Sequence, residues 1–223
     1  HLYKMSQPMI FSPISGGSFV AQTAILATIM PILTVKPAYF GNSGGAIANL
    51  IASKYSGTSE SMERILYSID KEIFIRPWVS SNMYLSKVLS PLVSLFSSSF
   101  YKDSVGPKTL METFYSENEL KKTEMWIGKF DIEANVTHLL CTRTDGTSIF
   151  NTEIKKKKQI KYLNDMTGTV KVEYAGGDID VISKTLNATS SIPGYKPPIE
   201  IDEILFVDGG VGAPSPGSSF PNI

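Results

Sequence analysis

Ser43 is the residue whose surroundings most directly suggest chemistry. It stands in "GNSGG" (41–45), a Gly-x-Ser-x-Gly pattern, with the apolar "PAYF" before it and the small-residue run "GAIANLIA" after it. A strand–Ser–helix turn of this kind is a nucleophile elbow, which holds its serine in a strained backbone conformation at the start of a helix. Gly41 and Gly45 relieve the crowding that larger neighbours would cause. From these residues alone, a catalytic serine and a structural turn both remain open.

A serine hydroxyl needs a base, because it is a poor nucleophile while protonated. Apart from the terminal histidine, the chain has only His138, in the strand-like "NVTHLLCT", where a half-buried core histidine is the favoured interpretation. His138 also precedes the late aspartates, which breaks the Ser–Asp–His order of α/β-hydrolases. A carboxylate is the alternative base. The run "LFVDGG" ends an apolar strand with Asp208, followed by Gly209 and Gly210, although Asp-Gly-Gly alone indicates a plain surface turn.

An acyl-transfer site also needs backbone donors that face the developing negative charge. The run "ISGGSF" (14–19) lies between an expected strand and an expected helix, where free N–H groups at a helix start are available. We expect these donors to be the backbone amides of Gly16, Gly17 and Ser18. The alternative is a dinucleotide or phosphate loop, but the spacing lacks the third glycine of Gly-x-Gly-x-x-Gly.

The elements that must position these residues alternate between strand and helix along the chain. This order predicts an α/β fold, a three-layer α/β/α sandwich with a mainly parallel central sheet and helices on both faces. Strands are expected at 8–14, 37–41, in two runs of 124–142, at 147–151 and at 203–210, and helices at 19–30, 45–56, 59–72 and 177–191.

Length and composition set further bounds. A chain of 223 residues fits one α/β domain, so we expect 1–223 to be a single catalytic domain. Lys plus Arg and Asp plus Glu both number 21, so no bulk charge indicates nucleic-acid binding. Cys141 is the only cysteine, which excludes an internal disulfide and a Cys-rich metal site.

The first 53 residues contain only two charged side chains, Lys4 and Lys36. Within them, "GSFVAQTAILATIMPILTV" is about long enough to span a bilayer. Gln22, three threonines and Pro31 dilute its apolarity. We therefore favour a strand, a glycine turn and a helix buried in the middle of an α/β sheet.

Together the three motifs resemble the patatin-like phospholipase family. That family has a Gly-rich oxyanion loop after its first strand, a Gly-x-Ser-x-Gly elbow and a late Asp-Gly-Gly, on a three-layer α/β fold. Here they appear as "SGGS", "GNSGG" and "DGG", and "NATSSIPGYKPPIEIDEILFVDGGVGAPSP" is similar to the family's approach to its aspartate. The resemblance covers roughly 8–56 and 177–216, and the middle of the chain is unmatched.

The resemblance implies a lipid acyl hydrolase, a phospholipase A, that needs neither a metal nor another cofactor. In it Ser43 is the nucleophile, Asp208 is the base, and the amides of 16–18 form the oxyanion hole. A lysophospholipase or carboxylesterase is the alternative within enzymes.

The implied substrate is a phospholipid or another acyl-ester lipid. The implied location is cytoplasmic with peripheral membrane association. The need for a protein activator is open. Nucleic acid is not an expected partner.

The chain departs from the family pattern at the oxyanion loop. Ser15 stands at the first glycine, Phe19 at the basic position and Val20 at the last glycine, and Ser215 replaces the asparagine that follows "DGG" in the family. These differences leave the lipid preference and the rate open. They are also what would favour an alternative of another class, a catalytically weak pseudoenzyme that binds lipid.

Two further segments are candidates for lipid contact. The apolar, serine-rich run 80–104 is a candidate lid or membrane-contact insertion, although an ordinary buried helical pair is favoured. The basic run "KKKKQIK" (155–161) suits anionic head groups, and a solvated loop suits it equally. Because the chain stops soon after Asp208, we expect a C-terminal portion of the fold to lie beyond Ile223.

Overall fold

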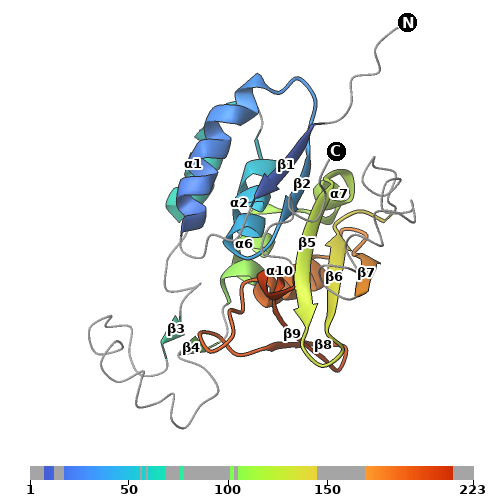
Figure 1. Cartoon of the computed structure of the whole chain (residues 1–223). Helices are drawn as coiled ribbons and strands as arrows, with labels where there is room; N and C mark the ends of the chain where they lie inside the picture. The colour runs from blue at the N-terminus through green and yellow to red at the C-terminus, as the bar shows by residue number, and fades with distance from the viewer. Residues whose placement is uncertain are drawn as a thin grey trace, which may run out of the picture.

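The protein is an α/β fold built around one mixed sheet (Figure 1). The computed structural model describes residues 8–12, 18–55, 57–58, 60–68, 76–77, 101–102, 105–144 and 169–212. Within these ranges the sheet consists of β1 (Met9–Ser12), β2 (Ala38–Gly41), β5 (Met125–Asp131), β6 (Val136–Cys141), β7 (Thr169–Tyr174), β8 (Ile199–Ile201) and β9 (Ile204–Asp208). The strands β3 (Arg76–Pro77) and β4 (Tyr101–Lys102) form a separate antiparallel pair.

The sheet is parallel along β1, β2 and β5, and again between β6 and β7. Two hairpin-like pairs make it mixed, since β5 and β6 are antiparallel, as are β8 and β9. The strand β9 also runs antiparallel to the second half of β5. The predicted α/β class with parallel strands is confirmed, while β7, β8 and the reversed direction of β9 were not predicted.

Six α-helices in the described residues contribute to one large core. They are α1 (Phe19–Ile29), α2 (Gly44–Ser53), α3 (Glu60–Ser68), α6 (Gly106–Phe114), α7 (Glu117–Lys122) and α10 (Ile179–Thr189). The predicted helices at 19–30, 45–56, 59–72 and 177–191 correspond to α1, α2, α3 and α10, whereas α6 and α7 were not predicted.

The two faces of the sheet differ in what covers them. On one face, side chains of β2 and β5 share a buried core with side chains of α2, α6 and α10. On the other face, a buried cluster contains strand residues only, with the Phe40 ring stacked between Phe11 at 4.9 Å and Trp126 at 6.3 Å between ring centroids. Within the described residues, the helical layer therefore lies on one side of the sheet. The expected strand 147–151 lies outside the described residues.

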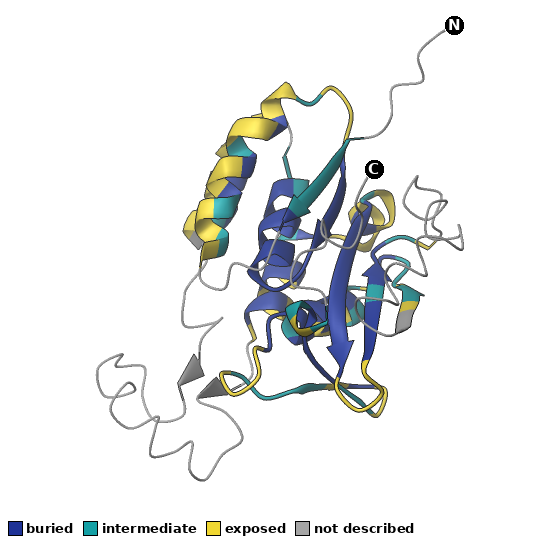
Figure 2. Ribbon diagram, in the orientation of Figure 1, coloured by how far each residue is buried: buried dark blue, intermediate teal, exposed yellow. Residues whose placement is uncertain are grey.

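The helix α2 is central and α1 is peripheral (Figure 2). Every residue of α2 from Gly44 to Ala52 is buried, as expected for a helix whose side chains are small and mostly apolar on all sides.

The expectation that the N-terminal apolar helix, α1, is buried was wrong. Because α1 packs on α2 rather than on the strands, one side of it faces solvent, and Ile25 and Ile29 are 58% and 40% exposed. Among the helices that the structure describes, none combines the length and apolarity needed to cross a bilayer.

Candidate active site

Ser43 occupies a strained turn between β2 and α2. Its φ is +56° and its ψ is −136°, a conformation that non-glycine residues adopt at appreciable energetic cost. The residue is 1% exposed, and its backbone N–H donates to Oγ1 of Thr189 over 3.0 Å. The N–H of Gly45 donates to the carbonyl of Asn42 over 3.0 Å and closes the turn. The predicted strand–Ser–helix turn is therefore present. The hydrogen bond to Thr189 of α10 helps to stabilise its strained backbone.

The first glycine of the elbow is required by close packing. A Cβ on Gly41 would lie 2.8 Å from both the backbone nitrogen of Ala46 and Nδ2 of Asn49. The side chain of Asn49 occupies this space, and its amide group makes hydrogen bonds that connect three elements. Its Nδ2 donates to the carbonyl of Phe40 over 2.9 Å, and its Oδ1 accepts from the hydroxyl of Ser12 over 2.6 Å. A satisfied buried amide thus fixes β1, β2 and α2 around the elbow.

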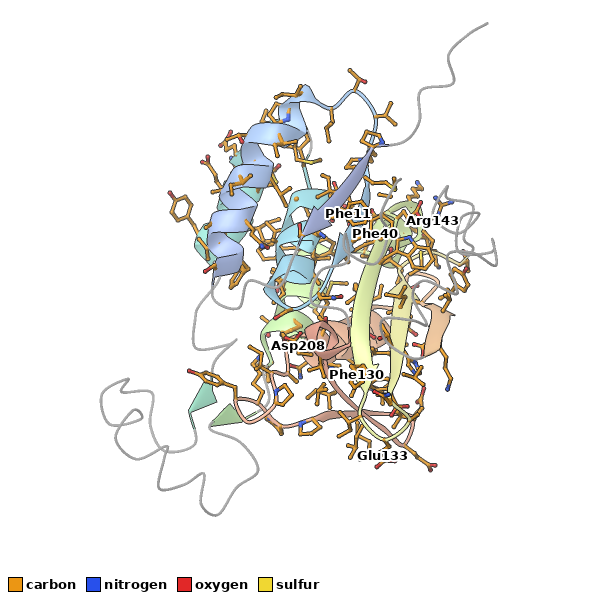
Figure 3. All side chains as sticks on the ribbon, in the orientation of Figure 1. Phe11, Phe40, Phe130, Glu133, Arg143 and Asp208 are labelled. Carbon is orange, nitrogen blue, oxygen red and sulfur yellow. The ribbon has the colours of Figure 1, made fainter. Side chains whose placement is uncertain are left out.

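Asp208 reaches the elbow because two strands end against the same edge of β5. β2 runs parallel to β5 and ends at Gly41, opposite Ile127, whereas β9 comes from the other direction and ends at Asp208, opposite Lys129. The carboxyl ends of β2 and β9 therefore meet on either side of Gly128. Figure 3 labels Asp208 among the elements α2, α10 and β5.

Glycines allow the carboxyl ends of β2 and β9 to approach the backbone of β5 closely. A Cβ on Gly209 would lie 2.2 Å from the carbonyl oxygen of Gly128, and one on Gly128 would lie 2.2 Å from Oδ1 of Asn42. The end of β9 therefore sits directly against the backbone of β5, with the elbow's asparagine beside both glycines. The N–H of Gly210 donates to Oδ1 of Asp208 over 2.8 Å, which fixes the rotation of the carboxyl group. The sequence did not single out Asn42 or Gly128, although glycine inside a strand is a known sign of close backbone approach.

The carboxyl group of Asp208 is buried and only partly satisfied. The residue is 3% exposed, and its Oδ2 is buried with no hydrogen-bond partner among the residues that the structure describes. Burial raises the pKa of Asp208, while the Gly210 N–H, the Ser43 side chain and the charge of Lys196 lower it in part. The Ser43 hydroxyl thus approaches the carboxyl group without completing a bond to Oδ2, and catalytic hydrogen bonds are often loose before substrate binds.

Three consecutive residues at the end of α10 connect the two predicted catalytic residues. Thr189 accepts the Ser43 N–H, the carbonyl of Ser191 accepts the N–H of Asp208 over 2.9 Å, and Oγ of Ser190 accepts a bond from Nζ of Lys196 over 3.2 Å. The sequence did not predict these contacts, because they join positions up to 146 residues apart. The short polar run "ATSS" ahead of the aspartate was the only local signal.

The predicted oxyanion donors are only partly described. Gly16 and Gly17 lie outside the described residues, and Ser18 is an exposed residue that directly precedes α1. Ser12 at the end of β1 pairs with Gly41 at the end of β2, so the chain leaves β1 beside the elbow. The candidate lid at 80–104, apart from the two strand residues of β4, and the basic run at 155–161 also lie outside the described residues.

His138 belongs to a separate buried cluster on β5, β6 and β7. It is 1% exposed, and its Nδ1 is hydrogen-bonded to Oε1 of Glu173. Nζ of Lys129 lies 2.9 Å from Oε2 of the same glutamate and 4.3 Å from the centre of the Phe206 ring. The prediction that His138 is a core histidine is confirmed. Its polar contacts here are with carboxylates, and its ring also packs edge-on against Phe206.

Two further observations concern a cavity and the grouping of metal-binding side chains. A cavity of about 700 Å³ lies at the far end of α2, where Ser53 and Lys54 line it, and its lining includes neither Ser43 nor Asp208. The strained serine and the buried carboxylate, rather than this cavity, mark the candidate site. In the part of the chain that the structure describes, no three His, Cys, Asp or Glu side chains are grouped as metal ligands would be.

Comparison with known protein families gives a match over most of the chain. The family model described as "Patatin-like phospholipase" matches residues 37–219, which include Ser43 and Asp208 and begin after the glycine loop at 14–19. No curated protein sequence matches the chain.

Proposed function

Since the chain belongs to the patatin-like phospholipase family, a family of lipid acyl hydrolases, we propose that it is a phospholipase A with a Ser43 nucleophile and an Asp208 base. The observation that carries this proposal is the position of a strained, positive-φ serine beside a buried carboxyl group, one oxygen of which has no hydrogen-bond partner within the described part of the chain. A carboxylate whose pKa is raised by burial is a stronger base than one in water. That combination is costly for the fold.

The mechanism is acyl transfer in two steps. Asp208 accepts the hydroxyl proton of Ser43 as Oγ attacks the ester carbonyl, and the tetrahedral intermediate then breaks its bond to the alcohol, which takes the proton. Asp208 next removes a proton from water as the water attacks the acyl-enzyme, and the fatty acid leaves while Oγ regains the proton. We assign the oxyanion contacts to the amides of Gly16, Gly17 and Ser18, because the chain leaves β1 beside the elbow.

Peripheral membrane contact, with the protein on the cytoplasmic side, is part of the proposal. The α1 helix and the turn after it expose large apolar side chains, and these residues bear no charge. Exposed apolar side chains on a helix next to a lipid-cleaving site suit insertion into the head-group region of a bilayer. The exposed side chains are Val20, Ile25, Ile29, Ile32 and Val35.

The test is release of fatty acid from a phospholipid with two different acyl chains in mixed micelles. We expect wild-type protein to release one chain and leave a lysophospholipid, and Ser43→Ala to release none above background. Ser53→Ala is the matched control, because this serine lies at the other end of α2, where its hydroxyl donates to the carbonyl of Leu50. Hydrolysis of single-chain lipids or soluble esters alone would favour a lysophospholipase or carboxylesterase, and binding without turnover would favour a pseudoenzyme.

A further inference from the structure

The cavity at the C-terminal end of α2 is separate from the candidate active site. Its volume of about 700 Å³ lies in the range of small-molecule sites. Ser53 and Lys54 line the cavity, whereas Ser43 directly precedes the other end of this ten-residue helix. At 1.5 Å per residue, the helix separates the two by about 15 Å. A small molecule held in the cavity therefore does not reach Ser43.

Part of the cavity wall is apolar. Ile65 and Tyr115 are buried and Tyr55 and Phe114 are half-buried, and all four line the cavity. The ammonium group of Lys54 lies over the ring of Tyr115, 5.2 Å from its centre. The cavity thus offers packing surface for the carbon part of a ligand in addition to polar contacts.

Positive charge exceeds negative charge in the lining of this cavity. Its ionised side chains are four cations and two carboxylates, namely Lys36, Lys54, Arg64, Lys122, Glu60 and Glu119. Glu119 is paired with Lys54 at 2.6 Å, and Glu60 is paired with Arg64 at 2.8 Å. Both carboxylates of the lining are therefore matched by cations of the lining. Lys36 and Lys122 give the cavity an excess of two positive charges.

Lys36 and Lys122 approach the cavity from the same edge of the sheet. The strands that follow them, β2 and β5, are parallel neighbours in which Tyr39 is opposite Met125. Each lysine precedes this pair of residues by three positions, so the two enter the sheet side by side. Two like charges beside a hollow with partly apolar walls raise the local positive potential, which attracts anions.

We propose that this cavity binds a phosphate group, with Lys36 and Lys122 as its cationic contacts and Phe114 and Ile65 against the carbon part of the ligand. A phosphate monoester carries about −1.5 to −2 charges at pH 7, which matches the excess in the lining. Its hydrogen bonds with ammonium groups are charge-assisted. The carrier of the phosphate is a soluble ester or the head group of an anionic lipid. This site is additional to the proposed acyl hydrolase function and does not depend on it.

The first arm of the test measures binding of a soluble phosphate ester. Glycerol phosphate is titrated into the Ser43→Ala variant in a calorimeter at constant ionic strength, with glycerol as the ligand control. We expect glycerol phosphate to bind and glycerol not to bind. Lys122→Met and Lys36→Met, each in the same background, should weaken binding by about tenfold or more, and Lys122→Arg should retain most of it.

A neighbouring lysine provides the matched control. Lys121 is exposed on α7, is paired with Glu117 at 3.6 Å and does not line the cavity. Lys121→Met removes the same charge from the next position in the chain and should leave the affinity unchanged. An equal loss in Lys121→Met and Lys122→Met would mean that the anion responds only to the overall charge of the surface, which would overturn the inference.

The second arm distinguishes a lipid head group from a soluble ligand. The same variants are sedimented with phosphatidylcholine vesicles that contain or lack phosphatidic acid. Binding to phosphatidic acid vesicles alone, lost in Lys122→Met and kept in Lys121→Met, identifies the ligand as a lipid head group, whereas the same pattern with glycerol phosphate identifies a soluble ester. If neither probe binds in a way that depends on Lys122, the inference is wrong. Failure of the hydrolase function would appear instead as no release of fatty acid by wild-type protein.

Discussion

Asp208 and Glu173 are carboxylates of the same sheet, and their surroundings move their pKa values in opposite directions. Burial raises the pKa of Asp208, and its three partial partners do not cancel the effect. Burial acts on Glu173 in the same direction, but hydrogen bonds from His138 and Lys129 outweigh it and lower the pKa to about 2. Full pairing stabilises the ionised glutamate, whereas incomplete pairing leaves the aspartate available to accept a proton.

Asp208 and Glu173 also differ in the backbone that surrounds them. Near Asp208 the chain contains a positive-φ serine and glycines packed against a carbonyl, while Glu173, His138 and Lys129 lie on regular, hydrogen-bonded strands. A strained serine and a buried carboxyl oxygen that has no hydrogen-bond partner among the described residues therefore lie together where β2 and β9 end. Proteins keep such costly features where function needs them.

The largest effect should come from removing the charge of Asp208. We expect Asp208→Asn to lower acyl hydrolysis by about 10²–10⁴-fold, the usual contribution of a general base. A carboxyl group whose pKa is raised in the folded state favours folding when protonated, and that stability is lost as the pH rises through the raised pKa. The neutral amide should therefore raise the melting temperature at pH 7 while activity falls.

Kinetics and thermal unfolding of the same preparation check this pair of effects. The equivalent change at the paired carboxylate, Glu173→Gln, is the control and should act in the opposite direction on stability. A lower melting temperature for Asp208→Asn at pH 7 would mean that its carboxylate stabilises the fold, as that of Glu173 does.

The next effect concerns the contact that holds the strained serine. Thr189→Val keeps the shape of the side chain but removes the acceptor of the Ser43 N–H, which becomes a buried donor without a partner. Such a loss destabilises a protein by about 1–3 kcal/mol. We also expect a lower kcat with little change in KM, because the turn is less firmly held. Denaturant unfolding and steady-state kinetics measure both, and Thr189→Ser, which retains the hydroxyl, should restore them.

The elements that carry Ser43 and Asp208 could be predicted from the sequence because their signals are local. Glycines flank the serine at fixed spacing and follow the aspartate, and an apolar run precedes each. The meeting of β2 and β9 against β5 could not be predicted, since nothing local shows that β9 runs antiparallel. The contacts of Thr189 and Lys196 likewise depend on where α10 ends. The exposure of α1 was missed because its apolar composition is the same as that of a buried helix.

The smallest effect should come from the cluster of His138, Lys129 and Glu173 on β5, β6 and β7. Glu173 has a lowered pKa, so it contributes stability that is present above its unfolded pKa and is lost as the pH falls toward about 2. Glu173→Gln should therefore lower the melting temperature at pH 7 and make it depend less on pH between about 4.5 and 2. Because part of the side chain is exposed to solvent, we expect a modest change. Melting curves across this range check it, and an unchanged pH dependence would contradict the role assigned to the cluster.

The pairing of Ser43 with Asp208 is tested most directly by the rate of labelling with a fluorophosphonate probe, which reacts only with activated serines. We predict that folded wild-type protein labels on Ser43, that Ser43→Ala does not label, and that Asp208→Asn labels at least about a hundredfold more slowly. A wild-type protein that fails to label in the presence of lipid vesicles, or an Asp208→Asn variant that labels as fast as wild type, would contradict the Ser–Asp mechanism.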